Sequence, residues 1–122
     1  MEIKRPGQVV VLRFPQTDLN PGKLRPALLM APLPGPYDDW LACMVSTQLH
    51  QAVRGFDEVI DRNSSDFVLS GLKVPSLIRV ARLAVVSREV LVGSLGEISS
   101  ERLQRIRKNL SSWIAGSSSQ AK

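Results

Sequence analysis

The fold of this chain is constrained most by the way proline and glycine interrupt its apolar runs. The 122 residues include eight prolines and eight glycines, and no apolar run between them is long. Short apolar runs bounded by turn formers are typical of β-strands. We therefore expect strands over 9–14, 26–31, 40–45 and 90–95, an alternating stretch over 77–86, and short candidates near 59–60 and 67–69.

The last part of the chain has a different period. Ser99 or Ser100 can cap a helix there, and Gly116 can end it. We expect this helix to lie across a small twisted barrel or a partly open sheet. Its apolar positions, spaced by three, four, three and one residues, form a single stripe of Leu103, Ile106, Leu110, Trp113 and Ile114.

Composition limits the class of function. The length fits one domain, which we expect over residues 1–116, with a disordered tail over 117–122. The net charge of +5 favours polyanionic partners. A single cysteine, Cys43, excludes an intramolecular disulfide, and no apolar run approaches the ~18 residues of a membrane span. With no signal peptide in view either, we expect a cytoplasmic protein.

Two stretches carry candidate chemistry. The first is the polar loop 15–23, longer than a tight hairpin needs, which leads directly to Arg25 and Pro26. The second is the run 44–48, in which Ser46 ends the third expected strand. A guanidinium forms a two-pronged contact that matches phosphate, and a hydroxyl can add one hydrogen bond. We therefore expect Arg25 and Ser46 to converge on a phosphate of single-stranded RNA.

Each of these residues also has a simpler explanation. Arg25 could pair with a carboxylate at a strand start, and Ser46 could be an ordinary strand-end hydroxyl. His50 is the only histidine and could be a solvent-facing loop residue. It could instead serve as a general base if the strand continued past Ser46, because alternate residues of a strand share a face. The further candidate RNA-binding residues are Thr17, Asp18, Asn20, Lys23, Gln48, Ser76 and Arg79.

The remaining charged and metal-binding residue types narrow the candidate site further. Arg79 and Arg82 differ by three, so they face opposite sides of a strand, and we favour Arg79 for the RNA side. No cluster of His, Cys and carboxylates has metal-ligand spacing, so we expect neither a metal nor a cofactor. The basic residues of the helix lie mostly off its apolar stripe and are expected on a solvated face: Arg102, Arg105, Arg107 and Lys108.

The order and spacing of five segments resemble one known family. Together the segments extend over most of the chain, roughly from Gly7 to Ile114, and the resemblance is to the MazF/PemK toxins of type II toxin–antitoxin systems. The strongest pieces are the Arg-Pro-Ala after the polar loop and the Leu-Lys-Val-Pro-Ser-Leu-Ile-Arg block. The segments are GQVVVLRFPQTD, KLRPALLMAP, ACMVSTQL, GLKVPSLIRVARL and VLVGSLGEIS.

The resemblance implies a mainly β fold with a C-terminal α-helix, an SH3-like small barrel of about five to seven strands. It also implies a homodimer and a metal-independent endoribonuclease that cuts single-stranded RNA. An antitoxin would cover the RNA groove with its C-terminal segment and could form a hetero-oligomer. The family's catalytic arginine corresponds to Arg25, and its hydroxyl residue to Ser46, or to Thr47 if the register differs.

The implied chemistry is attack of the RNA 2′-OH on the adjacent phosphorus, which leaves a 2′,3′-cyclic phosphate and a 5′-OH. Arg25 would stabilise the charge that develops on the phosphate oxygens, since an arginine is a poor proton acceptor. Some family features are absent: Gln8 follows Gly7 where many members have an acid, and no carboxylate directly precedes Arg25. These absences leave open a degenerate homologue that only binds RNA or an antitoxin. A second alternative is a gyrase-binding poison like the CcdB-type toxins, which share the same barrel.

Overall fold

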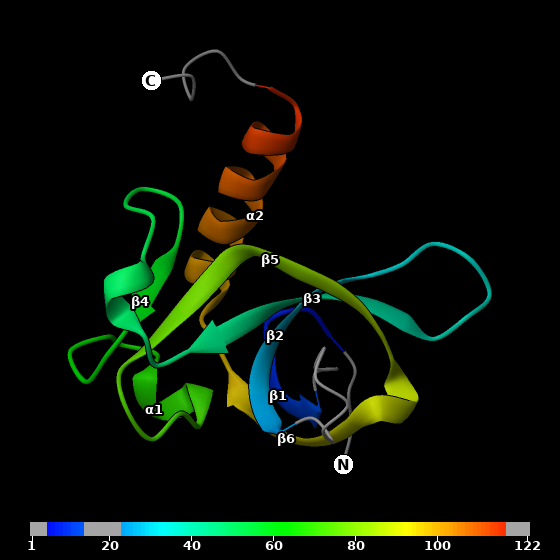
Figure 1. Ribbon diagram of the computed structural model, residues 1–122, viewed down its shortest axis with the longest axis horizontal. Coiled ribbons are helices and arrows are strands. Elements are labelled where there is room, and N and C mark those ends of the chain that lie inside the picture. Colours follow the sequence, from blue (N-terminus) through cyan, green and yellow to red (C-terminus); the bar gives the residue numbers. More distant parts are fainter. Residues whose placement is uncertain (1–4, 14–22, 117–122) are drawn as a thin grey trace.

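The structure is a computed structural model that describes residues 5–13 and 23–116. Six strands form one antiparallel sheet in the order β4-β5-β3-β2-β1-β6 (Figure 1). The strands are β1 (Gln8–Arg13), β2 (Leu24–Pro32), β3 (Asp39–Ser46), β4 (Glu58–Ile60), β5 (Ser76–Ser87) and β6 (Leu91–Glu97). The helices are α1 (Phe67–Ser70) and α2 (Ser100–Ile114), with 3-10 turns η1 (Leu49–Gln51) and η2 (Arg88–Val90).

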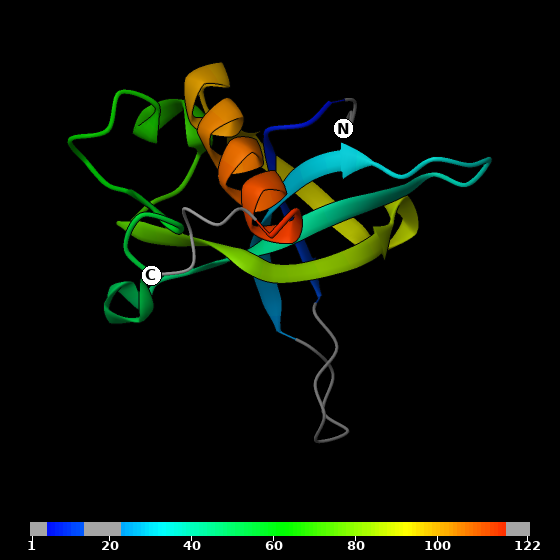
Figure 2. The same cartoon turned by 90° about the horizontal axis from the view of Figure 1, so that it is seen from above.

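The sheet is curled and its edges stay apart. Register shifts interrupt the pairing of β1 with β6, of β2 with β3, and of β3 with β5. Such shifts bend strands and increase their twist. The loop between β2 and β3 projects from the body (Figure 2). The expected class, mainly β with a C-terminal helix, is confirmed, although no hydrogen bond between the described edge strands β4 and β6 closes the barrel.

The two faces of the sheet bury two separate apolar cores. Residues alternate between them along each strand, as the two-residue period of a strand requires. The core under α2 contains Val9, Leu28, Met30, Cys43, Val45, Ile60, Phe67, Leu72, Ile78, Val80, Ile98, Ile106 and Leu110. The opposite core, inside the curl, contains Val10, Leu12, Ala27, Leu29, Trp40, Ala42 and Val86. Any strand residue can therefore be assigned to a face by its neighbours.

Helix α2 begins as expected, because the Ser99 hydroxyl accepts a hydrogen bond from the Arg102 backbone N–H. Ile106 and Leu110 are buried beneath it. The expected stripe is wrong at its end, since Trp113 is 52% exposed and Ile114 66% exposed. The last turn extends past the sheet, so Trp113 only meets the Phe56 ring edge-on, with centroids 6.0 Å apart.

Arg102 is not on a solvated helix face, which corrects the expectation from its position in the sequence. Its guanidinium is buried between two carboxylates. It donates to Asp66 through Nε and Nη2, at 2.9 and 3.1 Å, and to Glu58 through Nη1 at 2.9 Å. Arg105 adds two bonds to the same Glu58 carboxylate. These contacts fasten the start of α2 to β4 and to the residue that precedes α1.

The segment 67–69 is helical, so its assignment as a strand is wrong. Its helix α1 ends at Gly71, which has a φ of +75°. A Cβ at Gly71 would lie 2.1 Å from the Leu95 carbonyl oxygen, so β6 and the end of α1 can approach only through glycine. This close packing places α1 against β6 and leaves Val68 90% exposed.

Candidate functional site

Arg25 lies at the start of β2 and is exposed. It is paired in register with Leu12 of β1. Among the described residues it forms no hydrogen bond or ion pair, so the alternative in which it pairs with a carboxylate finds no partner there. Because Ala27 and Leu29 belong to the core inside the curl, Arg25 lies on that same face of the sheet.

Strands β2 and β3 separate just before Arg25 and Ser46 are reached. Their last pair is Ala27 with Met44. From there β2 continues beside β1 alone, whereas β3 continues beside β5, where Ser46 is paired with Leu77. Arg25 and Ser46 therefore lie two residues beyond one shared pair, on the two arms of a fork and on the same sheet face. We call this the β2–β3 fork.

Ser46 ends β3 with its side chain folded into the following turn. Its Oγ accepts a hydrogen bond from the Gln48 backbone N–H at 3.0 Å. This contact uses an acceptor lone pair and leaves the hydroxyl hydrogen to donate elsewhere. Thr47 and Gln48 follow it on the surface, and both are exposed.

Arg79 joins the same face from β5. Its neighbours Ile78 and Val80 belong to the core under α2, so Arg79 faces the other way, toward the side of Ser46. It is opposite Met44 in the ladder and thus diagonal to Ser46. Diagonal neighbours have Cα atoms about 7–8 Å apart. A second guanidinium is therefore placed on the β3 arm of the fork.

Other candidates lie elsewhere. Ser76 is buried on the opposite face, and its hydroxyl donates to the Val74 carbonyl at 2.8 Å, so it does not belong to the fork. His50 is in η1 rather than on an extended β3, so the condition for sharing a strand face with Ser46 is not met. Lys23 is exposed next to Leu24. Thr17, Asp18 and Asn20 lie outside the described residues.

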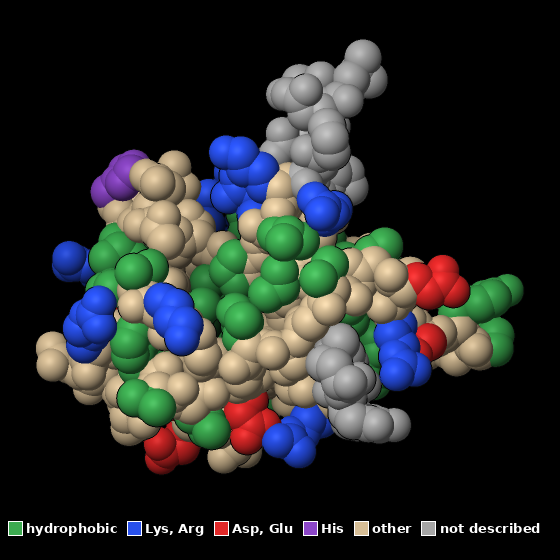
Figure 3. All heavy atoms as spheres, turned by 90° about the horizontal axis from the view of Figure 1, so that it is seen from below, with side chains coloured by type: hydrophobic (Ala, Val, Ile, Leu, Met, Phe, Trp, Pro, Cys, Tyr) green, Lys and Arg blue, Asp and Glu red, His purple; other side chains and the backbone are tan. Residues whose placement is uncertain are grey.

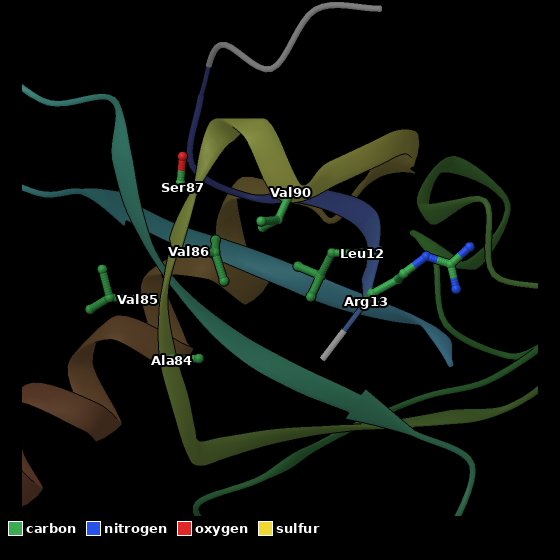
Figure 4. Close-up of a pocket in the computed structure, with 7 residues that line it drawn as sticks. All are labelled: Leu12, Arg13, Ala84, Val85, Val86, Ser87 and Val90. Atoms are coloured by element: carbon green, nitrogen blue, oxygen red, sulfur yellow. The ribbon is translucent and has the colours of Figure 1, made fainter. Parts of the chain in front are cut away.

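A pocket of about 200 Å³ adjoins Leu12, the β1 partner of Arg25, and it is lined by Leu12, Arg13, Ala84, Val85, Val86, Ser87 and Val90 (Figure 4). The side chains of Leu12, Val86 and Val90 converge in it, whereas the Arg13 guanidinium points away. Leu12 and Val86 belong to the core inside the curl, so the pocket is a gap at the rim of that core. None of the candidate site residues lines it, and we do not place the site there.

Two residues near Arg79 were missed by sequence reasoning. Gln51 of η1 accepts a hydrogen bond from Arg79 Nη1 at 2.8 Å. Asp57 accepts from the Val80 backbone N–H at 3.0 Å and from Val53 N–H at 2.9 Å. Both lie in the segment between β3 and β4, which shows no sequence period. The one signal was proximity in sequence to Ser46.

The remaining reactive groups are structural. Burial, together with the charge of Asp57, raises the pKa of the Cys43 thiol to about 12, so it is protonated at neutral pH. No three His, Cys, Asp or Glu side chains in residues 5–13 and 23–116 are grouped so that they could hold a metal ion. No helix in the described part of the chain is long and apolar enough to span a membrane.

Comparison with known proteins covers most of the chain. The family model of the PemK-like, MazF-like toxins of type II toxin–antitoxin systems matches residues 5–114. Among solved structures, an endoribonuclease in complex with its cognate antitoxin, from Mycobacterial species, is similar in fold. The TM-score is 0.62 at 13% identity, over 93% of this chain and 96% of that one. No match was found among curated proteins.

Proposed function

The chain belongs to the PemK-like, MazF-like toxins of type II toxin–antitoxin systems, and we propose that it is a metal-independent endoribonuclease acting on single-stranded RNA in the cytoplasm. The observation that carries this proposal is the exposed Arg25 at the β2–β3 fork, with no partner among the described residues. An arginine without a carboxylate partner retains its charge and its donors for an anionic ligand. The name of the structural neighbour, an endoribonuclease, supports the same activity.

In this proposal a phosphodiester lies in the fork. The 2′-OH loses its proton to solvent as its oxygen attacks phosphorus, the bond to the 5′-oxygen breaks, and that oxygen takes a proton from solvent. The products carry a 2′,3′-cyclic phosphate and a 5′-OH. Arg25 donates to the non-bridging oxygens, where negative charge grows in the transition state. Ser46, whose hydroxyl hydrogen is left free by the Gln48 contact, donates a further hydrogen bond. Thr47 lies next to it and could replace it.

The remaining exposed polar residues would hold the RNA strand. Lys23 and Gln48 lie on either arm of the fork, and Arg79 lies on the β3 arm. Cations contribute to affinity through the phosphates, and that contribution weakens as salt rises. Thr17, Asp18 and Asn20 are proposed to contact RNA from the loop before Lys23.

We propose two protein partners, a cognate antitoxin and a second copy of this chain. Hydrophobic side chains gather in the middle of one face of the molecule, with Lys and Arg side chains around them (Figure 3). Large apolar residues are exposed on several elements, including Leu69 of α1 and Val92 and Leu95 of β6. Exposed apolar areas bordered by charges are typical of protein interfaces. The antitoxin named in the structural neighbour's complex supports the first partner.

The proposal is tested by incubating the purified chain with a mixed-sequence single-stranded RNA, with and without EDTA. We expect discrete fragments in both reactions, with 2′,3′-cyclic phosphate and 5′-OH ends. Cleavage that disappears in EDTA would contradict the metal-independent mechanism. Fragments with 5′-phosphate ends would contradict attack by the 2′-OH.

Two other results would select the alternatives. Tight RNA binding without any fragment would indicate a homologue that only binds RNA. DNA damage on expression, without RNA cleavage, would indicate a gyrase poison. Growth arrest on expression with fragmented cellular RNA would support the endoribonuclease.

A further inference from the structure

Arg79 is held in an unusual way for a surface arginine. The residue is half-buried. One terminal nitrogen, Nη1, donates to the Gln51 side-chain oxygen at 2.8 Å. Its Nε is buried and has no hydrogen-bond partner among the described residues. A buried donor without a partner is unfavourable, so the fold holds this guanidinium in place at a cost.

The backbone next to Arg79 is fixed by the same segment. Between Leu83 and Arg79, three residues of β5 have no partner on β3, which is the signature of a bulge. The Val80 N–H within this bulge donates to Asp57 instead. Asp57 also closes its own loop by accepting from Val53 N–H. Gln51 and Asp57 therefore hold Arg79 from two sides, at the tip of its side chain and at the adjoining backbone.

Arg79 is held at a position from which it can contact RNA next to Arg25. It is diagonal to Ser46 on the face of the sheet that also carries Arg25. One strand, β3, separates β2 from β5, so a strand spacing of about 4.8 Å places their backbones about 10 Å apart across the sheet, and the two arginines can contact neighbouring phosphates of one RNA strand. Arg79 would thus contact the RNA beside the phosphate that Arg25 contacts.

We propose that Gln51 is a positioning residue, which holds the Arg79 guanidinium at the β2–β3 fork so that Arg79 binds a second RNA phosphate. The proposal rests on the RNA-binding function above. An amide suits this task because it accepts a hydrogen bond without cancelling the charge of the arginine. A carboxylate at the same point would hold Arg79 equally well but would neutralise it. The chemical identity of residue 51, rather than the contact alone, therefore determines the effect on RNA.

Gln51→Glu separates the two roles, because it keeps the contact to Arg79 and adds a negative charge that offsets the charge of the guanidinium. The probe is a mixed-sequence 2′-O-methyl RNA, which has no free 2′-OH and so cannot be cleaved by the proposed route. Its Kd is measured by fluorescence anisotropy over a series of salt concentrations. The matched control is Gln104→Glu, since Gln104 is exposed on α2 over the opposite face of the sheet and the substitution changes net charge equally.

We expect Arg79→Ala and Gln51→Glu each to weaken binding about tenfold, roughly the value of one charge-assisted hydrogen bond. The plot of log K against log salt has a negative slope. Each variant should make that slope less negative by about 0.7, the value for one phosphate contact on a single strand. Gln51→Ala should weaken RNA binding when it is introduced into the wild-type chain. Introduced into the Arg79→Ala variant, it should cause no further loss. Gln104→Glu should leave the slope unchanged.

The outcomes separate this proposal from the function it rests on. Gln51→Glu that binds as tightly as Gln104→Glu, while Arg25→Ala weakens binding, would overturn the role of Gln51 alone. A wild-type chain that fails to bind the probe would overturn both. Unfolding midpoints of the variants, measured in urea, show whether any loss of binding is instead a loss of fold.

Discussion

Two arginines of this chain, Arg25 and Arg102, differ in the burial and in the hydrogen-bond partners of their side chains. Arg102 is 8% exposed and donates four side-chain hydrogen bonds to Asp66, Glu58 and the Val59 carbonyl. Arg25 is exposed at the start of β2 and has no partner in the described parts of the chain. An arginine that uses four of its five N–H donors within the fold serves stability, whereas one with free donors on an open strand end is available to a ligand.

The comparison also shows what a cluster of charges on a helix means. The basic residues of α2 look alike in the sequence, yet they have different environments. Arg102 is buried in an ion-pair network, Arg105 only adds to it from the surface, and Arg107 donates to the Met30 carbonyl at 2.8 Å. Met30 lies at the register shift between Leu29 and Ala31, so it has no partner on β3. These basic side chains therefore attach α2 to the sheet rather than form a polyanion-binding face.

The largest effect on stability is expected from Arg102→Met. It leaves the Asp66 carboxylate buried without its cation, and breaking a buried pair in this way costs about 3–5 kcal/mol. The free energy of unfolding, measured in urea, reports this loss. Arg105→Met is the control, because its side chain is 53% exposed, and pairs at the surface contribute about 0–1 kcal/mol. Equal losses for the two variants would break the distinction between buried and surface arginine.

Acid should weaken the same network. Burial opposes ionisation of Asp66, but hydrogen bonds from the Arg102 side chain and the Ser99 backbone, with the Arg102 charge, lower its pKa below the ordinary 3.8. The unfolded chain then binds a proton that the folded chain does not, so this stabilisation is complete above that ordinary pKa and is lost as pH falls through the folded value. Urea midpoints between pH 6 and pH 3 should fall more steeply for the wild type than for Asp66→Asn. Parallel curves would show that Asp66 is not responsible.

A smaller effect is expected from Trp113→Ala. Because the ring is half exposed and has only an edge contact to Phe56, the loss should be about 1 kcal/mol. Ile106→Ala, on the same helix but fully buried, should cost about 2–5 kcal/mol. Urea unfolding of both variants makes the comparison. If Trp113→Ala lowered the free energy of unfolding more than Ile106→Ala, the Trp113 ring would have to be covered by another surface in solution.

Much of the fold could be predicted from the sequence, because its signals are local. Pro and Gly punctuation placed the long strands, and the 3.6-residue period with a serine cap placed α2. The helix α1 was missed because four residues are too few to show a period. The burial of Arg102 was missed because its partners, Asp66 and Glu58, are separated from it by 36 and 44 positions. Such a network exists only after β4 and α2 have packed.

The candidate site was predictable in part for the same reason. Arg25 and Ser46 follow from strand ends that are visible in the sequence, and the fork places them on one sheet face. The assignment of Ser76 is wrong because nearness in sequence to Arg79 does not mean nearness in space. The two residues differ by three positions on β5, so they face opposite sides of the sheet. Gln51 could not be found, because its contact with Arg79 joins a turn to a strand that comes 28 residues later.

The central claim is that Arg25 serves a ligand and not the fold, and measuring RNA cleavage and stability side by side for Arg25→Ala tests it most directly. We predict that the cleavage rate falls by about 10²–10³, the effect of losing one donor to the transition state. The free energy of unfolding should change by no more than about 0.5 kcal/mol. Full cleavage by Arg25→Ala, or a loss of activity that is matched by a loss of stability, would contradict the account.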